Sequence, residues 1–101
     1  MKTRDQILAF LSQNKKLFRD KYHIIRIGIF GSFAREEQKA KSDVDIMIEL
    51  NSERKYSMFD IIDISFLIEK QIGRKVDIVE KGYLKSTALK TATNDLIKIY
   101  G

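Results

Sequence analysis

Three segments of the chain have the apolar pattern of β-strands. Residues 23–30 (HIIRIGIF) are rich in isoleucine, residues 43–50 (DVDIMIEL) alternate between apolar and other side chains, and residues 75–80 (KVDIVE) form a shorter apolar run. Alternation with a period of two and an abundance of β-branched residues favour extended backbone. We therefore predict three short strands, the first of them mostly buried.

Four other segments have the spacing of helices. Residues 3–18 and 58–72 place apolar side chains three or four positions apart, and Gly73 follows the second segment as a stop signal. Thr3 is a suitable N-cap for the first helix. A short helix is predicted over 32–38 and a final helix over 84–101. The side chains expected to face the core are Ile7, Leu8, Leu11, Leu17 and Phe18 in the first helix, Phe59, Ile62 and Phe66 in the long helix, and Leu84, Leu89, Leu96 and Ile99 in the last.

This order of elements, α-β-α-β-α-β-α, predicts the α/β (α+β) class, with a small mixed β-sheet flanked by helices. The chain has 101 residues and no proline, and it contains neither a Gly/Ser-rich linker nor an internal repeat. We expect one domain that spans residues 1–101.

Composition narrows the class of protein. The chain has no cysteine, so disulfides and thiolate metal sites are excluded, and a metal would be held by oxygen ligands or by His23. Its net charge of +5 suits anionic partners such as nucleotides, RNA or an acidic protein face. No apolar run approaches the ~20 residues that span a bilayer, and the first residues have no signal-like apolar stretch. We expect a cytoplasmic protein with no membrane association.

Asp43 and Asp45 are the first candidates for chemistry. Alternate side chains of a strand share a face, so these two carboxylates point the same way and Val44 and Ile46 point the other way. Two adjacent carboxylates repel each other, and a divalent cation such as Mg²⁺ relieves the repulsion. If the strand with Asp77 lies beside them, three carboxylates converge. Such a set is sufficient for two metal ions that assist phosphoryl displacement.

A Gly-Ser pair supplies a candidate phosphate site. Gly31 and Ser32 stand where the first strand is predicted to end and the short helix to begin. Glycine permits close approach of a ligand to the backbone, and N–H groups at a helix start bind phosphate. The Ser32 hydroxyl can cap the helix or donate to a phosphate oxygen, and Arg35 can add positive charge nearby.

Each of these features alone has a more ordinary interpretation. An isolated Asp-x-Asp is usually a loop or cap, and an isolated Gly-Ser is usually a turn. Their combination at a fixed distance, Gly-Ser followed by ten residues and Asp-x-Asp, is expected roughly once in a thousand chains of this length from residue abundances. Asp60 and Asp63, by contrast, are expected on a solvated helix face, and His23 at a surface or strand edge.

The segment GSFAREEQKAKSDVDIMIE, residues 31–49, resembles the signature of the minimal nucleotidyltransferases of the DNA polymerase β superfamily. The resemblance covers most of the chain, because KVDIVE falls where that family has its third carboxylate. One departure is Glu36, where the family often has glycine. The resemblance implies a polymerase β-like nucleotidyltransferase fold.

The same resemblance implies a function. Members transfer a nucleoside monophosphate from a triphosphate to a hydroxyl and release pyrophosphate. By correspondence, Asp43, Asp45 and Asp77 would be the catalytic and metal-binding residues for two Mg²⁺ ions, and Gly31 and Ser32 would hold the phosphates of ATP. Short stand-alone members are commonly antitoxins that adenylylate a tyrosine of a HEPN-domain ribonuclease toxin, so we expect an adenylyltransferase antitoxin in a hetero-oligomer with such a toxin. Direct binding of nucleic acid is not expected.

Two other functions stay open from the sequence. The chain can be a binding module that covers its toxin sterically without catalysis. It can also be the nucleotide-binding subunit of a two-chain transferase that acts on a small molecule. The complete set of three carboxylates and the Gly-Ser pair favours the enzyme over the steric inhibitor.

Overall fold

The computed structural model describes residues 3–51, 58–83 and 85–101. Its helices are α1 (Arg4–Gln13), α2 (Lys15–Tyr22), α3 (Gly31–Ala34), α4 (Met58–Ile72) and α5 (Ser86–Asp95), with one 3₁₀ turn, η1 (Lys81–Tyr83). Its strands are β1 (Ile24–Phe30), β2 (Val44–Leu50), β3 (Val76–Glu80) and β4 (Ile97–Tyr100). Leu84, predicted as an inward position, lies outside the described residues.

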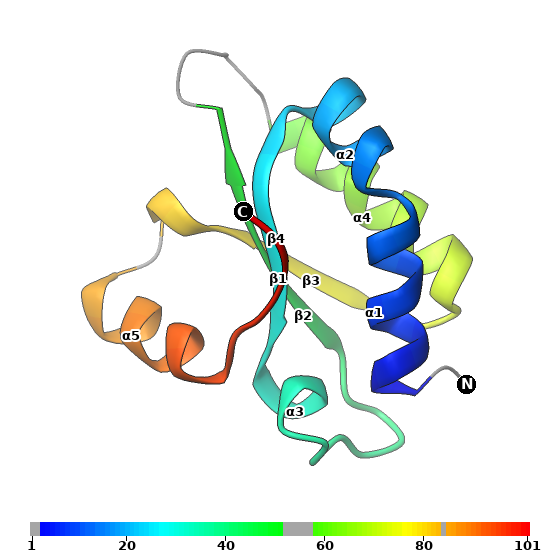
Figure 1. Ribbon diagram of the computed structural model, residues 1–101. Coiled ribbons are helices and arrows are strands. Elements are labelled where there is room, and N and C mark those ends of the chain that lie inside the picture. Colours follow the sequence, from blue (N-terminus) through cyan, green and yellow to red (C-terminus); the bar gives the residue numbers. More distant parts are fainter. Residues whose placement is uncertain (1–2, 52–57, 84) are drawn as a thin grey trace.

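The strands form one mixed sheet in the order β3-β2-β1-β4 (Figure 1). β1 is antiparallel to both of its neighbours, β2 and β4, whereas β2 and β3 are parallel. The three predicted strands are confirmed, and the small mixed sheet flanked by helices is the predicted fold class.

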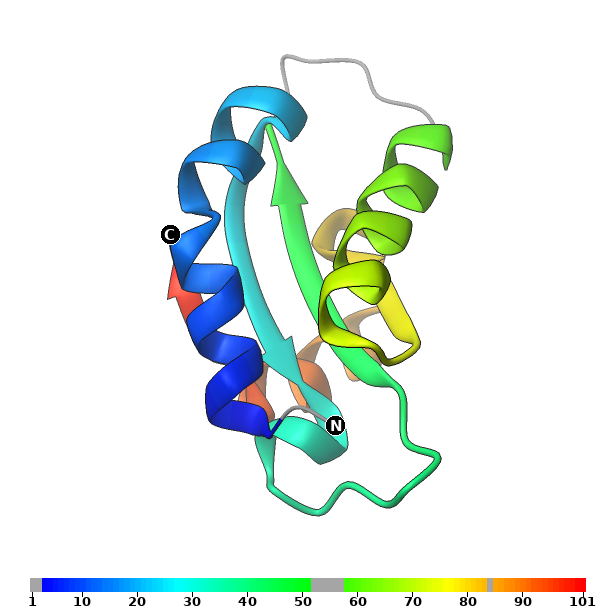
Figure 2. The ribbon, with the colours of Figure 1, turned by 90° about the vertical axis from the view of Figure 1, so that its right-hand side faces the viewer.

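The two faces of the sheet are covered unequally. Helices α1, α2 and α4 lie together over one face, and α5 lies on the opposite side (Figures 1 and 2). The apolar core fills the space under the three helices, where the fully buried side chains are Ile7, Leu11, Phe18, Ile29, Val44, Ile46, Ile48, Ile64 and Ile68. The other face is therefore the one on which polar side chains of the sheet can reach a ligand.

The predicted C-terminal helix is wrong beyond Asp95. Helix α5 ends there, and the following residues form strand β4, in which Lys98 pairs with Gly28 and Ile97 with Ile29 of β1. The spacing of Leu89, Leu96 and Ile99 is compatible with a helix. The alternation of Ile97, Lys98 and Ile99 has the period of a strand, however, and pairing with the free edge of β1 satisfies the backbone groups of both segments.

The N-terminal prediction of one helix over residues 3–18 is also corrected. Two helices, α1 and α2, meet at Asn14, whose amide side chain donates to the carbonyl of Phe10 at 2.8 Å. Thr3 caps α1 as predicted, in a reciprocal capping box with Gln6. The short helix predicted over 32–38 is a single turn, α3, and Glu36 after it adopts a positive φ of 58°.

The inward face predicted for α4 is wrong. Phe59 and Phe66 are 80% and 65% exposed, and Ile62 is 42% exposed. The residues that enter the core are instead Ile64, Ile68 and Ile72, which are spaced by four and lie on one side of the helix. Apolar side chains occur on two sides of α4, so their spacing alone could not identify the side that contacts the sheet.

Candidate active site

The side chains of strand β2 alternate between the apolar core and the face of the sheet that carries the candidate catalytic carboxylates. Val44, Ile46 and Ile48 are fully buried beneath the helices, whereas Asp45 is half-buried and belongs to the opposite face. Asp43 directly precedes the strand and is also half-buried. The sequence pattern therefore fixes which side of the sheet carries the carboxylates.

Pairing across the sheet brings the third carboxylate to the same row. Asp45 is the register partner of Asp77 on β3 and of Phe30 on β1. Directly paired residues on neighbouring strands point to the same face, so Asp77 shares the face of Asp45. Asp77 is exposed, and its carboxylate is accessible to solvent.

The electrostatics of Asp45 reflect this arrangement. Burial is the main cause that raises the pKa of Asp45 above its ordinary value, followed by repulsion from Asp77 and then from Asp43. Arg35 acts in the opposite direction and lowers the pKa. The three carboxylates are therefore electrostatically coupled, and their joint ionisation costs free energy in the absence of a cation.

The carboxylate oxygens of these three residues are of the kind that bind divalent cations. Mg²⁺ takes hard oxygen ligands and commonly uses one or two carboxylates together with substrate phosphates. Within the described ranges, no group of three acidic or histidine side chains already stands as a formed metal site. Asp43, Asp45 and Asp77 are the residues that would hold such a cation.

Gly31 brings the backbone next to Asp45. Its φ is +72°, which L side chains rarely adopt, and a Cβ at this position would lie 2.2 Å from Oδ2 of Asp45. Glycine is therefore required on both counts. No hydrogen bond in the described part of the chain uses the hydroxyl of Ser32, the next residue, which leaves it available to a ligand. The Gly-Ser turn and the carboxylate row thus lie next to each other.

Arg35 is held between two elements. Its Nε donates to Glu37 at 2.9 Å and its Nη1 to Asp95 of α5 at 2.5 Å. These hydrogen bonds, first to Glu37 and then to Asp95, raise the pKa of Arg35. Together with Gly31 and Thr91, Arg35 and Asp95 line an open hollow beside the Gly-Ser turn. Arg35 is therefore close enough to Asp45 to attract it, although part of its charge is compensated by its two acidic partners.

Arg74 is a residue of this region that the sequence did not reveal. It follows α4, and its Nη1 donates to the carbonyls of Ser42, Ala40 and Lys39 at 2.6, 3.2 and 3.5 Å. Its guanidinium also lies 4.9 Å from the centre of the Phe33 ring. Arg74 thus fixes the loop that leads into Asp43, and no local motif marks it in the sequence.

The remaining acidic and histidine candidates lie elsewhere. His23 directly precedes β1, at the end of the strand opposite to Gly31, and the seven residues of the strand span roughly 23 Å. Asp60 and Asp63 belong to α4, which covers the other face of the sheet. The Tyr22 hydroxyl donates to Asp63 at 3.2 Å, which indicates a structural role for that carboxylate. The helices of the described residues include none that could cross a membrane.

Comparison with known proteins identifies relatives along nearly the whole sequence. Residues 11–99 match the nucleotidyltransferase domain family. A protein adenylyltransferase, MntA, of Thermococcus cleftensis is 34% identical over 99 residues, which cover 98% of each chain. A candidate protein adenylyltransferase of Methanocaldococcus jannaschii is 38% identical over 100 residues, covering 98% of this chain and all of that protein.

Solved structures share the fold at lower identity. A candidate minimal nucleotidyltransferase superimposes with a TM-score of 0.80 at 23% identity, covering 95% of both chains. A toxin–antitoxin complex with AMP-PNP gives a TM-score of 0.73 at 19% identity, covering 86% of this chain and 69% of that one. A complex of a tri-AMPylated Shewanella oneidensis HEPN toxin with an MNT antitoxin gives 0.63 at 15% identity, with coverages of 91% and 71%.

Proposed function

Since this chain belongs to the nucleotidyltransferase domain family, we propose that it transfers AMP from ATP to a hydroxyl of a cognate HEPN-domain ribonuclease toxin and thereby neutralises the toxin. Its class as a nucleotidyltransferase follows from the family. The proposed transfer chemistry depends on one structural observation above all, the pairing of Asp45 with Asp77 beside the Gly31 turn.

In this proposal, the carboxylates of Asp43, Asp45 and Asp77 hold Mg²⁺. The metal would neutralise negative charge on the triphosphate and on the departing pyrophosphate, which is the chemistry that these carboxylates alone cannot supply. Gly31 allows the phosphates to approach the backbone, and the Ser32 hydroxyl donates to a phosphate oxygen. Arg35, already directed at this region by Asp95, adds positive charge beside the phosphates.

The transfer is a displacement at the α-phosphorus of ATP. The acceptor hydroxyl oxygen forms a new bond to this phosphorus, and the bond from the phosphorus to the bridging oxygen of pyrophosphate breaks. The hydroxyl proton passes to the Asp77 carboxylate and from there to water. Asp77 suits this role because it is the most exposed of the three carboxylates and can exchange its proton with solvent.

A protein acceptor is supported by the relatives and by the fold. The Thermococcus cleftensis relative is a protein adenylyltransferase, and structures of the same fold include an antitoxin with a tri-AMPylated HEPN toxin. The described helices and strands form the sheet and pack against it. On the carboxylate face, α5 is the one described helix, and it covers only part of that face. The acceptor hydroxyl, a tyrosine by analogy, would thus be brought by the partner.

Steric neutralisation without transfer is the second candidate. It is favoured by the exposed Phe59, Ile62 and Phe66 of α4, an apolar surface that a partner could cover. This surface lies on the opposite side of the sheet from the carboxylates. The two candidates therefore assign neutralisation to different sides of the molecule, and removal of the carboxylates separates them.

The test is co-expression with the neighbouring HEPN-domain protein, followed by intact-mass spectrometry of that protein. We expect one or more AMP units on the partner with the wild-type chain and none with the Asp43→Ala/Asp45→Ala variant. The matched control, Asp60→Asn/Asp63→Asn, changes two carboxylates on α4 and should leave the modification intact. Full neutralisation by Asp43→Ala/Asp45→Ala, with no mass added to the partner by the wild type, would overturn the transferase proposal in favour of steric cover.

A further inference from the structure

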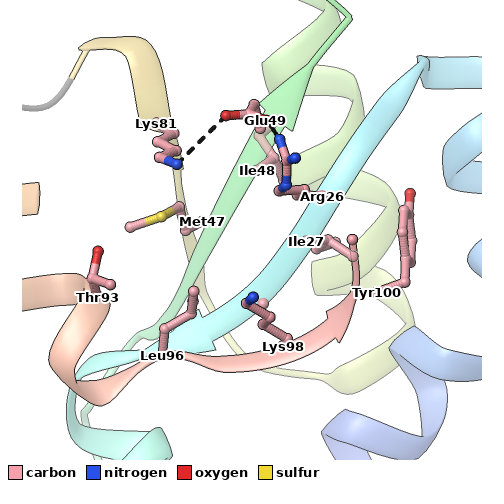
Figure 3. Close-up of a pocket in the computed structure, with 12 residues that line it drawn as sticks. Arg26, Ile27, Met47, Ile48, Glu49, Lys81, Thr93, Leu96, Lys98 and Tyr100 are labelled. Atoms are coloured by element: carbon pink, nitrogen blue, oxygen red, sulfur yellow. Dashed lines mark hydrogen bonds and ion pairs between the residues drawn. The ribbon is translucent and has the colours of Figure 1, made fainter.

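A second cavity lies on the carboxylate face of the sheet, beyond Asp45. It has a volume of ≈ 190 Å³, and its lining comes from β1, β2, β4, η1 and the end of α5 (Figure 3). Met47 occupies the floor, with Thr93 and Leu96 on one side and Lys81 on the other. None of the residues assigned above to metal or phosphate lines this cavity.

The cavity continues the row of the catalytic carboxylates. Asp45, Met47 and Glu49 are alternate residues of β2 and share one face. At the rise of a strand, Met47 lies roughly 7 Å and Glu49 roughly 13 Å from Asp45 along β2. A segment of polypeptide that placed a side-chain hydroxyl at Asp45 and Asp77 would have its neighbouring residues over this cavity.

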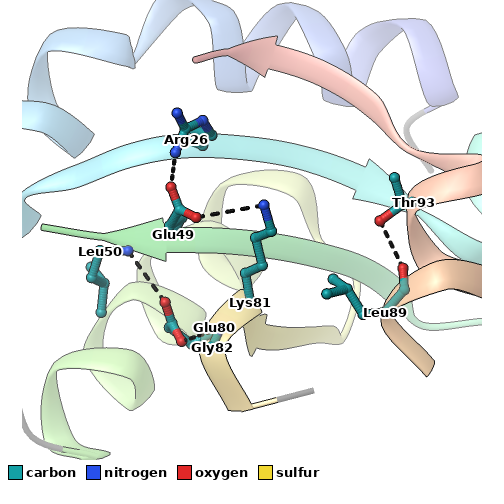
Figure 4. A network of polar contacts seen from close by, with 8 residues as sticks. All are labelled: Arg26, Glu49, Leu50, Glu80, Lys81, Gly82, Leu89 and Thr93. Atoms are coloured by element: carbon teal, nitrogen blue, oxygen red, sulfur yellow. Dashed lines mark hydrogen bonds and ion pairs between the residues drawn. The ribbon is translucent and has the colours of Figure 1, made fainter. Parts of the chain in front are cut away.

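The rim of the cavity is predominantly cationic. Arg26, Lys81 and Lys98 surround a single acidic residue, Glu49. Glu49 forms ion pairs with Arg26 and with Lys81, the latter at 3.7 Å (Figure 4). Lys98 takes part in none of the ion pairs found within the described ranges. The rim therefore keeps an excess of positive charge that is not compensated inside the protein.

The position of Lys81 is fixed by its neighbours. The carboxylate of Glu80 accepts hydrogen bonds from the backbone N–H of Leu50 at 3.5 Å and of Gly82 at 2.6 Å (Figure 4). These contacts hold the η1 turn against the end of β2. Lys81 is thereby placed beside Glu49 and over the cavity, and its ammonium is part of the cavity wall.

We propose that this cavity is the acceptor subsite, which binds an acidic segment of the partner protein next to the hydroxyl that receives AMP. The inference rests on the proposed transfer to a protein. Arg26, Lys81 and Lys98 attract the acidic side chains, Met47 and Leu96 contact the apolar part of the segment, and Glu49 orients two of the cations. A basic segment is rejected, because it meets the unpaired positive charge of the rim.

The first experiment measures binding without catalysis. Two labelled peptides are compared, each with a central tyrosine. In the acidic peptide glutamates flank the tyrosine, and in the basic peptide lysines flank it. We expect the acidic peptide to bind the wild-type chain at least tenfold more tightly by fluorescence anisotropy, and the Lys81→Glu/Lys98→Glu variant to lose this preference. The matched control, Lys70→Glu/Lys90→Glu, makes the same change of charge at exposed lysines outside the cavity and should bind as the wild type does.

The second experiment measures AMP transfer to the HEPN-domain partner. Lys81→Glu/Lys98→Glu should raise the KM for the partner about tenfold, with the KM for ATP unchanged, because the phosphates bind elsewhere. If neither peptide is preferred by the wild type, or if both charge variants behave alike, the acceptor subsite is ruled out even where transfer itself is observed. If the wild type transfers no AMP while the peptide preference holds, the transferase proposal fails and the acidic binding site stands.

Discussion

Asp45 of β2 lies directly opposite Asp77 of β3 in the parallel part of the sheet. Like charges at paired positions destabilise a sheet. Burial first, and then repulsion from Asp77, raises the pKa of Asp45 above its ordinary value. An apolar or neutral pair would serve folding better at this position. In the proposed function this conflict has a use, because a divalent cation between the carboxylates would convert their repulsion into attraction.

Replacement of Asp45 by asparagine should stabilise the metal-free protein. The folded-state pKa of Asp45 is raised above its ordinary value, so the folded chain binds more protons than the unfolded chain and becomes less stable as pH rises through this interval. Asp45→Asn removes the penalty at neutral pH. We expect the Tm of Asp45→Asn at pH 7 in EDTA to be about 2–4 °C above that of the wild type. Its Tm should also fall less than that of the wild type as the pH is raised from 4 to 7. Transfer of AMP should be abolished.

The control for this prediction is Asp63→Asn, which neutralises a carboxylate on α4 that accepts a hydrogen bond from Tyr22. It should lower the Tm or leave it unchanged. A lower Tm for Asp45→Asn would show that repulsion among the carboxylates does not limit stability.

Addition of Mg²⁺ and ATP should stabilise the wild-type chain. A ligand that binds only the folded state at a hundred times its Kd adds about 2.7 kcal/mol to the free energy of unfolding. Differential scanning fluorimetry should show the corresponding rise in Tm for the wild type. Asp77→Asn should lose this rise, because it removes a proposed metal ligand. Lys90→Gln, a change at an exposed residue of α5, is expected to respond as the wild type does.

Gly31→Ala should be destabilising for two separable reasons. The positive φ of +72° strains any L side chain, and the new Cβ would meet the Asp45 carboxylate at 2.2 Å. Gly73→Ala is a matched control, since its φ is +70° but no atom lies within 4 Å of the position that its Cβ would take. Both variants should lose about 1–2 kcal/mol from backbone strain, and Gly31→Ala alone should also weaken Mg-ATP binding in a calorimetric titration.

Arg74→Lys should impair transfer by releasing the loop before Asp43. Lysine keeps the charge but cannot reproduce a guanidinium that donates to three carbonyls and lies over Phe33. We expect kcat to fall about tenfold with the KM for the partner unchanged, and amide exchange at residues 39–43 to accelerate. Lys41→Gln, which removes a nearby exposed charge, should affect neither; an equal effect would point to simple electrostatics.

Tyr100→Phe should weaken the closure of the sheet by β4. The buried Tyr100 hydroxyl donates to the carbonyl of Ile24 at 2.7 Å, and burial raises its pKa to about 12. Loss of this buried hydrogen bond should cost about 1–2 kcal/mol in urea unfolding at pH 7. Tyr22→Phe removes an exposed hydrogen bond instead and should cost under about 0.5 kcal/mol; similar values for both would argue against a buried role for Tyr100.

Much of the sheet could be predicted because its strands carry their own signals. The alternation in residues 43–50 identified both the buried face and the carboxylate face, and the apolar run around Asp77 identified its neighbour. Strand β4 was missed because IKIY is only four residues long and follows a segment with helical spacing. The alternation of Ile97, Lys98 and Ile99 is too short a local signal to identify a strand, and the extended form depends on a tertiary contact, the pairing with the free edge of β1.

The sequence could predict only those parts of the candidate site whose residues are close together along the chain. The Gly-Ser turn and the Asp-x-Asp pair are short motifs within one segment. The contacts of Arg35 with Asp95 and of Arg74 with the loop at 39–42 join residues about 30 to 60 positions apart, and nothing in the spacing indicates them. The exposed Phe59 and Phe66 show the same limit, since their burial depends on how α4 is rotated against the sheet.

Strand β2 joins the core and the chemistry in a single stretch of seven residues. An insertion or deletion of one residue within it would move the side chains on one side of the change to the opposite face of the sheet. Isoleucine side chains would then replace carboxylates on the exposed face, and carboxylates would enter the apolar core. Such a change would destroy folding and catalysis at once. The strand should therefore tolerate the exchange of single residues better than any change in its length, because a change in length displaces the buried side chains and the carboxylates together.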